Sequence, residues 1–164
     1  MTNKYLQSIR EYIFAIICAI LFSITIPTDS IQSIQNVFIY FLSLIPLTTP
    51  SLLLVNLGTM ILILICGLKY IESVSFFIVL NGIAFGIILA MYKATILTFI
   101  SLVFPHSIFE TSLMIIYCSQ VKFLSKAYKQ KDHQQIKYSW QIIFFVCIPL
   151  WLISGILEGS AVIK

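Results

Sequence analysis

A series of long apolar runs, separated by short polar segments, most constrains what this chain can fold into. The stretch SLLLVNLGTMILILICGL, residues 51–68, contains no charged residue. A helix that crosses a bilayer needs about 20 mostly apolar residues. Of the 164 residues, 60% are hydrophobic and only 10% are charged, and the mean hydropathy is +1.03. Soluble domains do not have this composition, so the sequence predicts an integral membrane protein.

We expect one all-α domain over residues 1–164, a polytopic transmembrane helix bundle of about five spans. The apolar runs place the spans at 12–26, 51–68, 73–91, 94–124 and 138–158. Pro105 interrupts the fourth span, and we expect a helix break there because proline suits a first helical turn but kinks a helix interior. Residues 31–46 have a shorter apolar part and are predicted to form an interfacial or re-entrant helix, although the pattern leaves open whether they span the membrane.

The basic residues orient the predicted bundle. Lys and Arg are enriched on the cytoplasmic side of membrane proteins. With a cytoplasmic N-terminus and an outer C-terminus, eight of the ten basic residues lie inside and two lie outside. Topology thus explains the positive charge, and no nucleic-acid partner is expected. Five of the eight form a basic segment, predicted to be a cytoplasmic loop against anionic lipid headgroups or a partner: Lys122, Lys126, Lys129, Lys131 and Lys137.

Small residues recur at helical spacing within the third span. Gly82, Gly86 and Ala90 follow one another at intervals of four and therefore share one helix face. Such residues let two backbones approach closely in lipid. The pattern predicts a helix-packing face but not whether its partner is a neighbouring helix or a second copy of the chain. In the last span, Tyr138, Trp140 and Trp151 are expected to be anchors at the membrane interface.

A few polar residues remain inside the predicted spans. Polar and charged groups at that depth are costly, so they are expected to face the bundle interior and to pair. His106 and Glu110 are four residues apart and share a helix face. In the predicted topology all of these residues can meet in the outer half of the bilayer. We expect one intramembrane polar cluster, formed by Asn56, Asn81, His106, Glu110 and Glu158.

Three interpretations of this cluster stay open. It could be a hydrogen-bond network that fixes the helix register. It could be a proton or ion relay, since intramembrane His and Glu commonly form one. It could also bind a divalent metal through His106, Glu110 and Glu158, although one His and two carboxylates are few ligands for a metal site. No metal or other cofactor is otherwise expected, because the four cysteines lie in separate apolar segments without ligand spacing.

Signatures of catalysis are missing from the sequence. There is no H-E-x-x-H, no G-x-S-x-G and no phosphate-binding loop, and the second histidine, His133, lies in the basic segment. We therefore expect a protein that is not an enzyme.

The order of these features resembles the stage II sporulation protein M family of bacterial integral membrane proteins, over roughly Ser51 to Ile163. That family has an early Asn in one span, an Asn-Gly with a following Gly in the next, a Pro-His-Gly-x-x-Glu motif and a Glu near the end of the last helix. In this sequence Ser107 stands where the motif has Gly. The residues at the family positions are Asn56, Asn81, Gly82, Gly86, Pro105, His106, Glu110 and Glu158.

The resemblance implies a non-enzymatic accessory or scaffold protein of the bacterial cell membrane. Short members of the family that occur beside circular bacteriocin genes imply a role in the export, maturation or immunity of a hydrophobic peptide, with an exporter as partner. A small transporter or channel that uses the polar cluster is the alternative. The sporulation members imply a further one, a membrane anchor for cell-wall hydrolases.

Overall fold

The computed structural model describes residues 2–25, 33, 49–91 and 104–162, and within these ranges it contains helices and no strand. The prediction of an all-α fold is confirmed for this part of the chain. Residues 31–46, where an interfacial or re-entrant helix was predicted, lie outside it except for Ser33. The elements are α1 (Thr2–Thr25), α3 (Thr49–Lys69), α4 (Ile71–Met91), α6 (Phe104–Gln130), α7 (His133–Ile142), the π-helix η2 (Ile143–Cys147) and α8 (Ile148–Val162).

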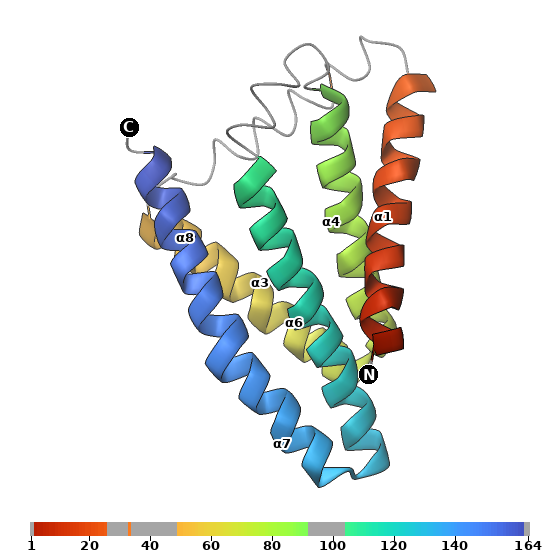
Figure 1. The fold of residues 1–164 in the computed structure, drawn as a ribbon, viewed down its shortest axis with the longest axis vertical. Coiled ribbons are helices and arrows are strands. Elements are labelled where there is room, and N and C mark those ends of the chain that lie inside the picture. The colour runs from red at the N-terminus through yellow and green to blue at the C-terminus, as the bar shows by residue number, and fades with distance from the viewer. Residues whose placement is uncertain (1, 26–32, 34–48, 92–103, 163–164) are drawn as a thin grey trace.

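The helices run roughly along one long axis, and α6 lies between the others (Figure 1). It packs against α1, α3, α4, α7, η2 and α8. At one end, called here the basic end, α1, α4 and α7 begin while α3 and α6 finish. All eight Lys and Arg residues of the described ranges lie nearer this end, seven on helices and one, Lys131, between α6 and α7: Lys4, Arg10, Lys69, Lys122, Lys126, Lys129, Lys131 and Lys137.

Two helices are long and apolar enough to cross a membrane. They contain the segments Tyr5–Phe22 and His133–Ile156, with hydropathies of 1.5 and 1.9. Within the described residues α3 and α4 carry shorter apolar segments, Leu53–Lys69 and Ile71–Ile87. The predicted number of about five spans is therefore not confirmed. Many large apolar side chains point outward, among them Phe14 and Phe145, which are 68% and 78% exposed. Surfaces of this kind are typical of a protein in contact with lipid or a partner.

The predicted basic loop is wrong, because helices occupy this segment. Lys122, Lys126 and Lys129 lie on α6, Lys137 lies on α7, and only residues 131 and 132 connect the two helices. Lysine, alanine and glutamine favour helices, so this polar segment continues the helix of the apolar run before it. For the same reason α6 continues to Gln130, beyond Leu124, where the fourth span was predicted to end.

A tight double cap makes the short connection between α6 and α7. Lys131 adopts a left-handed conformation with φ 55°. Its backbone N–H donates to the Tyr128 carbonyl, and the Asp132 N–H donates to the Ala127 carbonyl at 3.0 Å. This pair of bonds is a Schellman motif, which satisfies the last carbonyls of α6. The Asp132 carboxylate also accepts from the Gln135 N–H at 3.0 Å and caps the start of α7.

The first turn of α6 contains Pro105. Because the first N–H groups of a helix have no partner within it, proline is tolerated there, as the sequence predicted. The part of the predicted fourth span that precedes α6, residues 94–103, lies outside the described residues.

The apolar core lies where α3, α4, α6 and the last helix meet. Ile63, Ile78 and Leu124 are almost fully buried there. The Tyr117 hydroxyl donates to the Met60 carbonyl at 2.7 Å, and its ring meets the Trp151 ring edge to face.

Trp151 was predicted to be an interface anchor, and this is wrong because its side chain is 8% exposed and belongs to the core. The π-helix η2, which joins α7 to α8, lies just before it in the chain.

Candidate functional site

A cavity of about 340 Å³ lies between the first halves of α3 and α6, the second half of α4 and the first turn of α8, toward the end of the bundle opposite the basic end. It is partly open, and its lining mixes polar with apolar side chains. The lining residues are Asn56, Thr59, Asn81, Ala84, Phe85, Glu110, Thr111, Met114 and Trp151. The cavity thus collects three of the five residues of the predicted polar cluster: Asn56 from α3, Asn81 from α4 and Glu110 from α6.

The other two residues of the predicted cluster lie at the same end of the bundle. His106 is in the first turn of α6 and Glu158 is near the end of α8. Their side chains fall outside the described part of the structure. The hypothetical metal set of His106, Glu110 and Glu158 is therefore not tested. Among the side chains that are described, no three His, Cys, Asp or Glu residues come together in a metal-binding group.

Two hydrogen bonds position the polar groups that α6 contributes. The Ser154 hydroxyl on α8 donates to Glu110 Oε1 at 3.0 Å. The next residue on α6, Thr111, shares a hydrogen bond of 3.1 Å with the Tyr12 hydroxyl on α1. Ser154 is fully buried, which is permitted because its hydroxyl has a carboxylate partner. The carboxylate is thus held by a helix that is distant in sequence.

The Asn56 side chain has an unusual environment. Its Nδ2 is buried and, in the part of the chain that is described, has no hydrogen-bond partner. A Cβ added at Gly155 of α8 would lie 3.5 Å from this nitrogen and 2.8 Å from Leu53 Cδ2. The absence of a side chain at Gly155 therefore lets α8 approach α3, and the nitrogen end of the amide is directed at α8. A buried donor without a partner costs about 1 to 3 kcal/mol.

Gly82 and Gly86 place α4 directly against α1. A Cβ at Gly82 would lie 2.8 Å from Ala15 Cβ, and one at Gly86 would lie 2.7 Å from Ala19 Cβ. The face that these glycines form therefore meets a neighbouring helix of the same chain. The side chain of Ala90, the third member of the predicted packing face, is outside the described part. This close approach brings Tyr12 of α1 near the cavity.

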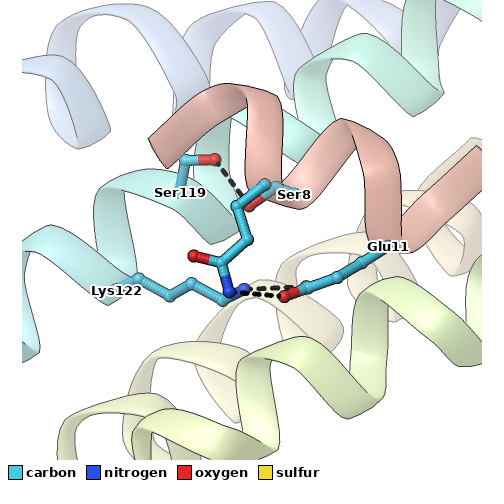
Figure 2. Close-up of polar contacts among 5 residues, drawn as sticks. Ser8, Glu11, Ser119 and Lys122 are labelled. Atoms are coloured by element: carbon cyan, nitrogen blue, oxygen red, sulfur yellow. Dashed lines mark hydrogen bonds and ion pairs between the residues drawn. The ribbon is translucent and has the colours of Figure 1, made fainter. Parts of the chain in front are cut away.

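A second polar group joins α1 to α6 nearer the basic end (Figure 2). Lys122 Nζ lies 2.9 Å from Glu11 Oε2, and both side chains are mostly buried. The Gln7 amide also donates to Glu11, at 3.1 Å. One turn away, Ser119 donates to Ser8 at 3.1 Å, and both are buried.

Sequence reasoning missed this ion pair and several residues of the cavity. Glu11 was not singled out, although an acid beside an apolar run needs a partner. Thr111 adjoins Glu110 in the sequence, which is a signal that could have identified it. Ser154 and Trp151 precede Glu158 by four and seven residues on the same helix, but no spacing rule connects them to α6.

The chain was compared with protein families, curated proteins and solved structures. No curated protein and no solved structure matches it. The family model of stage II sporulation protein M matches residues 11–161, which include α3, α4, α6 and the whole cavity lining. This match and the two long apolar helices indicate a membrane protein of the accessory kind. The chain therefore belongs to the stage II sporulation protein M family.

Proposed function

We propose that this protein is a non-enzymatic, multi-pass accessory protein of the bacterial cell membrane that assists the export, maturation or immunity of a hydrophobic peptide. It works beside a membrane partner such as an exporter. Family membership and the apolar outer surface of the helices support this proposal. The observation that carries it is the cavity, whose lining offers one carboxylate and two amides beside Phe85, Met114 and Trp151. Such a mixed lining suits binding of a partly apolar group.

Helix length supports a topology of five spans. At 1.5 Å per residue, α3 and α4, with 21 residues each, are about 31 Å long, close to the roughly 30 Å of a hydrocarbon core. The helices α1 and α6 are longer. The gathering of Lys and Arg at the basic end supports a cytoplasmic location for that end, with the N-terminus inside and the C-terminus outside, because Lys and Arg are enriched on the cytoplasmic side of membrane proteins.

A gene deletion tests the proposal in a bacterium that makes a hydrophobic peptide. We expect loss of mature peptide from the medium, loss of tolerance to added peptide, or both. The wild-type gene and a Glu72→Gln variant should restore the phenotype, because Glu72 is exposed in the first turn of α4 and is not part of the cavity lining. A Glu110→Gln variant should restore it poorly. Unchanged release, maturation and tolerance after deletion would refute the proposal.

A small transporter or channel is the second candidate, and the partly open polar cavity favours it. Purified protein in liposomes should then move ions or substrate, and Glu110→Gln should abolish the movement while Glu72→Gln does not. Co-purification with an exporter, without flux in liposomes, would leave the accessory function and exclude transport.

A further inference from the structure

Basic and polar side chains of α1 and α6 surround two hollows toward the basic end. The first, of about 20 Å³, lies between the helices and is lined by Gln7 of α1 and by Ser119, Lys122, Phe123 and Lys126 of α6. The second is an open depression of about 460 Å³ on α1, lined by Gln7, Arg10, Glu11 and Phe14. Because Gln7 lines both, the two hollows adjoin each other.

The lining of the two hollows carries excess positive charge. The Lys122 ammonium group is compensated, since it pairs with the Glu11 carboxylate at 2.9 Å (Figure 2). Arg10 and Lys126 are exposed, and within the described part of the chain neither forms an ion pair. Three basic residues and one acidic residue leave a net charge of +2. The site therefore attracts an anionic group.

An exposed apolar stripe continues from these hollows along α1. Gln7, Arg10, Phe14, Ile17 and Leu21 follow one another at intervals of three and four residues, so they share one face of the helix. All five side chains are exposed. The first two positions of this face are polar or basic, and the other three are apolar. A ligand that fits the whole face has an anionic end and a long apolar part.

The length of the stripe matches one leaflet of a bilayer. At 1.5 Å per residue, Arg10 and Leu21 are about 16 Å apart along the axis of α1. Half of a hydrocarbon core is about 15 Å thick. The same helix contains a segment long and apolar enough to cross a membrane, Tyr5–Phe22. The apolar part of the stripe thus has the length of one extended acyl chain in its leaflet.

We propose that α1 and α6 form a binding site for one anionic phospholipid. Its phosphate lies within reach of Arg10 and Lys126, where the guanidinium group can donate two hydrogen bonds to phosphate oxygens. One acyl chain lies along the apolar stripe. A zwitterionic lipid is disfavoured, because its own cationic group would approach a site that is already positive. This inference goes beyond the accessory function and beyond a general attraction of the basic end to a membrane surface.

Native mass spectrometry of the full-length protein in a neutral detergent tests the proposal, because it resolves each bound lipid by its mass. Phosphatidylglycerol and phosphatidylcholine with identical acyl chains would be titrated separately. We expect saturable binding of one phosphatidylglycerol at concentrations where phosphatidylcholine shows no saturable binding. Glycerol 3-phosphate carries the anionic group without the acyl chains, and at the same concentrations it should not displace the lipid.

Two charge variants connect this binding to the site. Arg10→Gln and Lys126→Gln should each weaken phosphatidylglycerol binding about 5-fold, the contribution of one basic residue near anionic lipid. The double variant should weaken it about 25-fold. Neither side chain has an ion-pair partner among the described residues, so the fold should be retained, which circular dichroism would verify. Phe14→Ala should weaken binding several-fold, because it removes apolar contact with the acyl chain.

Lys137→Gln is the matched control. It removes the same charge from an exposed position on α7 that lines neither hollow, and it should bind like the parent. Four results would overturn the inference: equal affinity for the two lipids, displacement by glycerol 3-phosphate, unchanged affinity in the double variant, or an equal loss in Lys137→Gln. The last result would mean that the whole basic end attracts anionic lipid without a specific site. None of these results depends on the gene-deletion phenotype.

Discussion

Replacing Gly86 by alanine should separate α1 from α4. A Cβ at this position would lie 2.7 Å from Ala19 Cβ and 2.9 Å from the Ile16 carbonyl oxygen. Carbon atoms in contact are normally about 3.5 to 4.0 Å apart, so the added methyl group is roughly 1 Å too close. One of the two obstacles is backbone, and no change of rotamer can remove it. The helices must therefore move apart, and overpacking of this kind costs about 1 to 3 kcal/mol.

Gly58 provides the matched control for this substitution. It also lies within a helix, but a Cβ there would meet nothing within 4 Å among the described atoms. Both substitutions gain the same helix propensity, about 1 kcal/mol, because alanine replaces glycine in a helix interior. The difference between Gly86→Ala and Gly58→Ala therefore isolates the clash, and we expect it to be about 1 to 3 kcal/mol.

The difference in the free energy of unfolding can be measured on purified protein in mixed micelles. Sodium dodecyl sulfate is increased to unfold the protein, and circular dichroism follows the loss of helix. Ala19→Gly should recover part of the loss in the Gly86→Ala variant, because it removes one obstacle and leaves the carbonyl of Ile16. Equal stability of Gly86→Ala and Gly58→Ala would refute the reasoning, since it would mean that α1 and α4 are not in close contact at this position.

The same unfolding assay checks three further predictions. Glu11→Gln and Lys122→Met should each cost about 1 to 3 kcal/mol, because each leaves a mostly buried charge without its partner, and the double variant should cost less than the sum; strict additivity would contradict the ion pair. Lys131→Gly should raise stability by about 1 kcal/mol, since φ 55° disfavours residues with a side chain, and no gain would argue against this turn. Tyr117→Phe should cost about 1 kcal/mol through loss of the bond to the Met60 carbonyl, and an unchanged midpoint would contradict that bond.

The residues that share the cavity were predictable because of their contrast with their surroundings. Asn56 and Asn81 stand alone in apolar runs, and Glu110 is an acidic residue between two such runs. Burial in lipid forces groups of this kind toward the bundle interior. Helical spacing then placed the glycines of α4 on one face. These inferences need only local sequence and the properties of the bilayer.

Pairings between distant segments could not be predicted in this way. Glu11 and Lys122 are 111 residues apart, and no local pattern connects them. The helix in the basic segment was not predicted for a different reason: its lysines were interpreted only as evidence for the orientation in the membrane. The pattern of Asp132 followed three residues later by Gln135 did contain a helix-start signal, because such pairs cap helices.

The π-helix η2 sets the angular register of everything that follows it. The buried residues Ser139, Ile143, Cys147 and Trp151 recur at intervals of four, and in a regular α-helix each such interval turns 40° too far. The π-helix accommodates roughly one extra residue in its wider turn. Relative to a regular α-helix, the residues after it are therefore rotated back by about 100°, which offsets this drift. Deletion of one residue within η2 would turn Ser154 away from Glu110 without changing either side chain. The geometry of the cavity thus depends on a count of residues in a segment that does not touch it.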